Sequence, residues 1–173
     1  MLTIFKLMWR NLVQGPSTEP FPFGETTTPE RLRGKVAVDA KACTGCEVCI
    51  SVCAGGALRQ EERADGSGKD FYVWHNTCAF CGLCQEYCPT GAIRLTTDWS
   101  TVHLNQDKYT YREQVFIAHA SCEQCSARMP RMPHGTIETI YGRTNPHLDT
   151  LYRLCPQCRR EKAAIQLGAN FHE

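Results

Sequence analysis

The first apolar residues of the chain recur at helical spacing. Within residues 2–14 (LTIFKLMWRNLVQ), Lys6 and Arg10 lie on a different face from the apolar positions, and this pattern predicts an amphipathic helix. Gly15-Pro16 is expected to end the helix, because proline cannot continue the backbone hydrogen bonds. The apolar stripe consists of Leu2, Phe5, Met8, Trp9, Leu12 and Val13.

The segment that follows is rich in proline. Residues 16–29 hold four of the nine prolines of the chain, so we expect an extended arm there. A helix and an arm of this kind bury little surface by themselves. Three roles are open for the helix: docking on a protein partner, lying in a membrane interface, or folding back on its own domain.

Short strand patterns come next. Residues 35–38 (KVAV) alternate and are expected to pair with residues 93–95 (IRL), as short strands at the edge of a small sheet do. Residues 59–70 are charged and contain glycine, which predicts a solvated hairpin loop. This loop leads into a strand at 71–74 (FYVW).

The last part of the chain has the pattern of a separate module. Residues 98–114 form a polar connector, and residues 115–118 (VFIA) resemble a strand that enters the second module. A helical pattern begins at Leu148, and a short helix over residues 161–167 is expected to stop at Gly168.

The middle of the chain contains an internal repeat. Residues 42–59 (ACTGCEVCISVCAGGALR) align without gaps on residues 77–94 (TCAFCGLCQEYCPTGAIR) at an offset of 35 residues. Duplication of this kind predicts two equivalent loops related by a pseudo-twofold axis. The copies differ after the last cysteine, where Pro89 in the second corresponds to Ala54 in the first. That difference can alter hydrogen bonding to a cluster sulfur without removing a ligand.

The repeat carries eight of the twelve cysteines, at the C-x2-C-x2-C-x3-C spacing of cubane iron–sulfur clusters. Three thiolates of one loop bind three irons, and the fourth iron takes a cysteine from the other run. A disulfide framework or a set of zinc knuckles would not explain two identical runs with matching tails. The predicted ligands are Cys43, Cys46, Cys49 and Cys88 for cluster 1, and Cys78, Cys81, Cys84 and Cys53 for cluster 2.

The tail contains two further C-x2-C pairs, separated by 29 residues. Two such pairs are the ligand pattern of a tetrahedral thiolate site, most often structural zinc. A rubredoxin-like single iron, a further iron–sulfur cluster and an empty site are the alternatives. A closed site of four cysteines leaves no position for a substrate. The predicted metal ligands are Cys122, Cys125, Cys155 and Cys158.

Charge and composition exclude several classes of function. A net charge of +1, from 19 basic and 18 acidic residues, gives no electrostatic footprint for nucleic acid. No apolar run reaches the roughly 18 residues of a membrane span, so we expect a soluble or peripheral protein. Phosphate-loop, nucleophile-elbow and dinucleotide-binding motifs are absent, so we expect no catalytic residues here. A high cysteine content without a secretory leader favours metal ligands in a reducing compartment.

Taken together, these features resemble a known family. An N-terminal amphipathic helix, a proline-rich arm, a strand at 33–38 (RGKVAV) and cysteine runs at 43–53 and 78–88 are similar to the two-cluster hydrophilic subunit shared by respiratory complex I and the membrane-bound nickel–iron hydrogenases. The paired C-x2-C motifs of the tail narrow the resemblance to the ferredoxin-type subunit of formate hydrogenlyase.

The resemblance implies a non-catalytic electron-transfer subunit. It would bridge a peripheral electron-input protein and the small, cluster-bearing hydrogenase subunit above a membrane arm, on the cytoplasmic face of the inner membrane. The alternatives are a freely diffusing ferredoxin with two 4Fe–4S clusters and a zinc-dependent scaffold or nucleic-acid module. The arm and the nearly neutral charge favour the subunit over the diffusing carrier, which would use a charged surface to steer its encounters.

The expected fold is α+β. Its centre is a bacterial-ferredoxin-like core with two 4Fe–4S clusters over residues 33–97. The N-terminal amphipathic helix and docking arm (1–32) precede this core, and a connector with a small four-cysteine metal-binding module (98–173) follows it.

Overall fold

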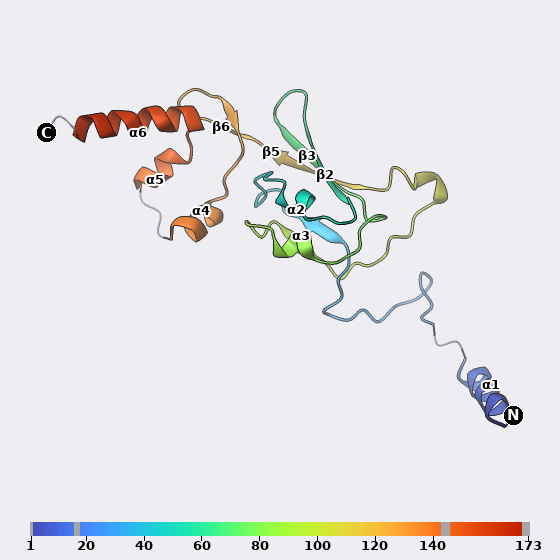
Figure 1. Cartoon of the computed structure of the whole chain (residues 1–173). Coiled ribbons are helices and arrows are strands. Elements are labelled where there is room, and N and C mark those ends of the chain that lie inside the picture. Colours follow the sequence, from blue (N-terminus) through green and yellow to red (C-terminus); the bar gives the residue numbers. More distant parts are fainter. Residues whose placement is uncertain (1, 16–17, 143–145, 171–173) are drawn as a thin grey trace. The chain divides into compact units, whose positions relative to one another are not determined.

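A computed structural model describes residues 2–15, 18–142 and 146–170 (Figure 1). The chain divides into two compact units, Met1–Leu32 and Arg33–Glu173. In the described part of the chain, no helix is both long and apolar enough to cross a membrane.

The first unit contains the predicted helix, α1 (Leu2–Gln14). Gly15 follows it with φ +73° and donates its N–H to the Asn11 carbonyl at 3.1 Å, so the helix ends at the expected place. Pro16 lies outside the described residues. Large apolar side chains of α1 are exposed, namely Ile4, Phe5, Leu7, Met8, Trp9, Leu12 and Val13.

The described part of the arm contains no helix or strand. A turn closes where Phe23 N–H donates to the Pro20 carbonyl at 2.8 Å, and Thr27 N–H donates to the Glu19 carboxylate at 3.1 Å. The arm is therefore held by local hydrogen bonds within its own unit.

The second unit begins with a two-stranded sheet. Strand β1 (Val36–Val38) pairs antiparallel with β4 (Ile93–Leu95), so that Val36 lies opposite Leu95. This confirms the pairing predicted from the sequence, although the first strand begins one residue later. Two short helices, α2 (Val48–Ser51) and α3 (Leu83–Glu86), lie in the two copies of the repeat.

A three-stranded antiparallel sheet in the order β2-β3-β5 lies in the same unit (Figure 1). Its strands are β2 (Leu58–Glu62), β3 (Gly68–Val73) and β5 (Glu113–Ala118). The prediction of a loop over residues 59–70 was wrong, because only residues 63–67 form the turn. The charged residues Arg59 and Glu61 lie on the exposed side of β2, and their polarity hid the strand.

Strand β5 also differs from the prediction. It begins at Glu113, and it pairs along its whole length with β3, with Val115 opposite Phe71. We had expected it to enter a second module, but it completes the sheet that follows the first cysteine run. Gly68 allows the close pairing, since a Cβ there would overlap the Ile117 carbonyl.

The core of this unit is built around the cysteines. Cys43, Cys49 and Cys84 are buried with apolar side chains from both sheets. Cys53, Cys78 and Cys88 pack against this core from its edge. The apolar members are Val36, Leu58, Phe71, Val73, Ala92, Ile93 and Ile117.

The 3-10 turn η1 (Asn105–Asp107) lies before β5. The tail follows β5 and begins with a short hairpin of β6 (Ala120–Ser121) and β7 (Arg128–Met129). Three helices follow: α4 (His134–Tyr141), α5 (Pro146–Leu151) and α6 (Pro156–Asn170). The sequence did not predict α4. The helical pattern near Leu148 corresponds to α5.

The helix expected over residues 161–167 was too short. Helix α6 begins at Pro156 and continues through Gly168. Proline is favourable in the first helical turn because its missing N–H has no partner there in any case. A glycine inside a helix costs about 1 kcal/mol relative to alanine, which is too little to end a helix of this length.

Candidate metal centres

Both copies of the cysteine repeat adopt the same backbone. Helices α2 and α3 each start after a residue in the left-handed region, Glu47 with φ 65° and Gly82 with φ 84°. These residues are 35 positions apart, as are the cysteines that the helices carry, Cys49 and Cys84. Only glycine adopts this conformation without strain, so the non-glycine residue at position 47 shows that the loop geometry itself is required.

Backbone N–H groups point at the sulfur atoms of both loops. Gly45 donates to Cys43 Sγ at 3.4 Å, and the equivalent Phe80 donates to Cys78 Sγ at 3.4 Å. Ala57 donates to Cys53 Sγ at 3.3 Å. Hydrogen bonds of this kind stabilise thiolates and the negative charge of a bound iron–sulfur cluster.

One pocket brings cysteines of the two runs together. A mainly apolar pocket is lined by Cys53 together with Cys78, Cys81 and Cys84. The fourth cysteine of the first run therefore lies with the first three of the second run.

Cysteines of the first run also raise one another's pKa. Burial raises the pKa of Cys43, and the neighbouring thiols that add to the rise are Cys46 and Cys88. Burial raises the pKa of Cys49 to about 12, with Cys43 and Cys46 adding to it. Clustered buried thiols resist ionisation unless a cation compensates them, and the iron atoms of a cluster supply such charge. The donor set and its N–H groups thus fit 4Fe–4S clusters.

Cys88 differs from its neighbours. Its burial would raise the pKa, but the Thr90 hydroxyl, 3.6 Å from Cys88 Sγ, and the backbone N–H groups of Thr90, Ile93 and Ala92 bring the pKa below its ordinary value. These donors therefore favour the thiolate form of Cys88. The sequence analysis did not single out Thr90.

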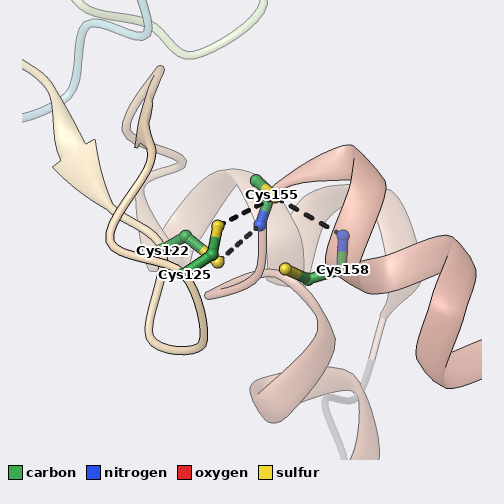
Figure 2. Close-up of side chains that lie close together, drawn as sticks. All are labelled: Cys122, Cys125, Cys155 and Cys158. Carbon is green, nitrogen blue, oxygen red and sulfur yellow. Dashed lines mark hydrogen bonds between the residues drawn. The ribbon is translucent and has the colours of Figure 1, made fainter.

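The four cysteines of the tail form a compact group (Figure 2). Their sulfur atoms all lie within 4.8 Å of one another. Cys122 follows β6 and Cys125 lies in the turn before β7, whereas Cys155 precedes α6 and Cys158 lies in its first turn. The predicted pairs of the tail are therefore brought together across the intervening residues.

Backbone hydrogen bonds shape this tetrahedron. Cys122 N–H donates to the Ala127 carbonyl at 2.9 Å. Ser126, with φ 59°, donates its N–H to the Cys122 carbonyl at 2.9 Å. Cys155 N–H donates to Cys122 Sγ at 3.2 Å, and Cys158 N–H donates to Cys155 Sγ at 3.5 Å. Each C-x2-C pair is thus a tight turn whose N–H groups point at sulfur.

All four thiols can act together as thiolates only around a cation. The N–H of Cys155 is the main cause of a lowered pKa at Cys122, about 6, whereas burial raises the pKa of Cys158. Thiols in contact cannot all ionise without a positive ion among them. Among the described residues, the group contains four cysteines and no histidine or carboxylate, so the site can bind a metal through thiolates alone.

Two polar side chains near the first loop were missed by the sequence analysis. Gln60 Oε1 and Lys69 Cδ flank Gly45, at 3.4 and 3.5 Å from the position a Cβ would take. Both come from the sheet β2-β3, whose strands were not predicted over these residues. Extending the repeat alignment by one residue pairs Gln60 with Leu95. That polar-for-apolar difference would have drawn attention to Gln60.

Comparison with known proteins agrees with this geometry. Residues 42–92 match the 4Fe-4S dicluster domain family and include both cysteine runs. The chain therefore contains a 4Fe–4S dicluster domain.

The chain is similar to subunits of quinone oxidoreductases and of formate hydrogenlyase. It is 28% identical over 101 residues to NAD(P)H-quinone oxidoreductase subunit I of Gloeobacter violaceus, covering 56% of this chain and 48% of that one. The match thus spans about half the length of that relative. It is 25% identical over 175 residues to formate hydrogenlyase subunit 6 of Escherichia coli K12, covering 94% and 92% of the two chains.

A solved structure of the membrane-bound sulfane sulfur reductase, an archaeal respiratory membrane complex, contains a similar chain. The similarity has a TM-score of 0.44 and 19% identity, and it covers 81% of this chain and 69% of the other.

Proposed function

We propose that this protein is an electron-transfer subunit that relays electrons through two 4Fe–4S clusters within a membrane-associated assembly of the formate hydrogenlyase or complex I type. The observation that carries the proposal is the pair of equivalent cysteine loops with N–H groups aimed at sulfur, inside a segment that matches the dicluster domain. The similarity to formate hydrogenlyase subunit 6 extends over 94% of the chain and so includes the tail.

Cluster 1 is assigned to Cys43, Cys46, Cys49 and Cys88, and cluster 2 to Cys78, Cys81, Cys84 and Cys53. The pocket that contains Cys53 with the second run supports this crossed assignment. The influence of Cys88 on Cys43 supports it from the other side. A bound cluster supplies the one-electron chemistry, and the protein holds it, shields it from water and tunes its potential.

The tail site is proposed to hold one structural zinc ion, with a rubredoxin-like iron as the alternative. Three of its cysteines are buried, and Leu154 and Met129 pack against them. A closed tetrathiolate site stabilises a small module and has no open position for a substrate.

Helix α1 is proposed to attach the subunit to its assembly. Its apolar side chains are exposed, with 71% of Phe5, 70% of Trp9 and 77% of Leu12 open to solvent. An apolar surface this large on a short helix is characteristic of an interaction site. The proposed partners are an electron-input subunit and a cluster-bearing hydrogenase or complex I-like subunit, on the cytoplasmic side of a membrane arm.

Gentle solubilisation of membranes followed by purification of the tagged full chain tests this function. We expect eight irons and eight acid-labile sulfides per chain from two cubane clusters, together with stoichiometric co-purification of other cluster-bearing subunits. Recovery of a cluster-loaded chain without partners, entirely in the soluble fraction, would instead identify a diffusing ferredoxin. About four irons per chain without labile sulfide would contradict the cluster assignment itself.

A further inference from the structure

The surroundings of the two loops differ despite the shared backbone. The repeat supplies each cluster with equivalent backbone donors, such as Gly45 N–H and Phe80 N–H, both at 3.4 Å from a cysteine sulfur. Differences between the clusters therefore come from the side chains and from the additional backbone N–H groups at Cys88. Three polar side chains lie on the cluster 1 side: Gln60, Lys69 and Thr90.

Gln60 is the first of these. Its Oε1 atom is buried and has no hydrogen-bond partner, and it lies beside Gly45 in the first loop. A buried amide oxygen without a donor costs free energy. Half a turn of the side-chain amide presents its NH2 group instead, and that group can donate to sulfur of a bound cluster. The equivalent residue 35 positions later is Leu95, which has no donor and whose Cδ1 lies beside Gly82 of the second loop.

Thr90 is the second donor. Its hydroxyl lies 3.6 Å from Cys88 Sγ, and Cys88 is the proposed fourth ligand of cluster 1. The equivalent position beside Cys53 is Gly55. A Cβ at Gly55 would overlap the Thr77 carbonyl, so there is no room for such a side chain beside Cys53, the proposed fourth ligand of cluster 2.

Lys69 adds positive charge on the same side. In the sheet register, Phe71 lies opposite Gln60, and Val36 lies opposite Leu95. Lys69 lies two residues before Phe71. The equivalent position, two residues before Val36, is Gly34, so the second loop has no lysine at this position. The side chain of Lys69 is 22% exposed and forms an ion pair with Glu47 at 2.7 Å. Because Glu47 offsets part of the charge, the two neutral donors contribute more to the difference.

One charge acts in the opposite direction. Arg33 donates from Nη1 to the Cys81 carbonyl at 3.1 Å, beside the second loop. Arg33 is exposed, and water and salt screen a charge at the surface. Donors close to the sulfur atoms and shielded from solvent, such as the part-buried Thr90 hydroxyl, are screened less, so they outweigh it.

Reduction adds one negative charge to a cluster, and donors to its sulfur atoms stabilise that charge. We infer that Gln60 and Thr90, assisted by Lys69, tune cluster 1 to a higher reduction potential than cluster 2. A single electron shared between the clusters then resides mainly on cluster 1, and transfer from cluster 2 to cluster 1 is the downhill direction. The inference rests on the proposed ligand assignment.

Redox titration of the full chain carrying both clusters, monitored by electron paramagnetic resonance, tests the inference. The Cys46→Ser variant identifies which signal belongs to cluster 1. Gln60→Leu and Thr90→Val should each shift the electron partition between the clusters about tenfold toward cluster 2, which corresponds to about 59 mV for one electron. The reverse exchange, Leu95→Gln, should raise the potential of cluster 2.

The outcomes separate the inference from the proposed function. Two intact cluster signals whose potentials do not move in Gln60→Leu, Thr90→Val and Leu95→Gln would overturn the inference alone. A larger shift of cluster 2 than of cluster 1 in the first two variants would do the same. If the wild-type chain lacks two 4Fe–4S signals, the proposed function fails and the inference fails with it. Should Gln60→Leu fold poorly, Thr90→Val decides, because it keeps the shape of the side chain.

Discussion

Arg63 and Asp70 close the β2–β3 hairpin through two hydrogen bonds, from Nε to Oδ2 at 2.9 Å and from Nη2 to Oδ1 at 2.8 Å. The Arg63 guanidinium also lies 4.0 Å from the centre of the Phe116 ring on β5. One side chain thus joins all three strands of the sheet that carries Gln60 and Lys69. A planar guanidinium makes such paired contacts, which lysine cannot reproduce.

This ion pair predicts an acid-sensitive sheet. The hydrogen bonds from Arg63 lower the pKa of Asp70. A carboxyl whose pKa is lower in the folded state stabilises the fold at pH values above its ordinary pKa of about 4, and that contribution is lost as the pH falls through the lower, folded-state value. Asp70→Asn should therefore be less stable than wild type at neutral pH and flatter in its response to acid.

Thermal unfolding of the cluster-loaded chain at neutral pH, where its acid-labile sulfide is retained, measures the stability that the ion pair contributes. Glu86→Gln, on the exposed side of α3, is the matched control and should follow the wild-type curve. Equal melting temperatures of wild type and Asp70→Asn would show that the ion pair adds no stability.

The sequence predicted the chemistry better than the framework around it. Cysteine spacing alone suggested which thiols gather, because a short loop of fixed length can bind a cube in few ways. The helix over residues 2–14 and the strand pair of residues 35–38 and 93–95 were also predictable, since their hydrophobic patterns match regular elements.

What the sequence could not show depends on long-range contacts. Strand β2 carries Arg59, Glu61 and Glu62, and only its pairing with β3 makes a strand of so polar a segment. The position of Lys69 beside Gly45 depends on the same pairing. Helix α6 continues past Gly168 to Asn170, because one glycine weakens a helix by only about 1 kcal/mol. The metal of the tail and the domain boundary at residue 97 stay predictions.

The crossed ligand assignment predicts that replacing the fourth cysteine of one run impairs the cluster held by the other run. Cys53→Ser should impair cluster 2, because Cys53 lines the pocket with Cys78, Cys81 and Cys84, and Cys88→Ser should impair cluster 1. Electron paramagnetic resonance of each reduced variant measures which signal changes. Loss of cluster 1 in Cys53→Ser and of cluster 2 in Cys88→Ser would show that the ligands do not cross.

The tail site predicts that its metal can be removed without loss of the two clusters. Replacing Cys122 and Cys125 by serine removes two of four thiolates, and such a site does not retain zinc with the remaining pair. We expect one metal ion fewer per chain, faster proteolysis of the tail and both cubane signals intact, because binding of the metal contributes to folding of its module.

Metal analysis and limited proteolysis of the purified variant measure these effects. Ser121→Ala, next to the site but without a thiol, is the control and should keep the metal. Normal folding of the double variant together with loss of electron transfer would point to a redox-active iron in the tail.

Helix α1 predicts attachment that depends on one of its faces. Trp9 is 70% exposed, and burying an indole on a partner or a membrane interface contributes about 3 kcal/mol, at roughly 25 cal/mol per Å² of apolar surface. Trp9→Glu should therefore shorten the residence time on the assembly about a hundredfold, since each 1.4 kcal/mol corresponds to about a factor of ten. Gln14→Glu is the matched control: it adds the same charge on the polar face and keeps an acceptor for Arg10, which donates to Gln14 at 3.0 Å. Fractionation of solubilised membranes measures both variants, together with a chain lacking residues 1–28.

The cluster spectrum should survive in all three chains, because the first proposed ligand is Cys43. Equal retention of Trp9→Glu and wild type would remove the attachment role, and loss of the cluster spectrum on deletion of residues 1–28 would show that the helix stabilises the ferredoxin core.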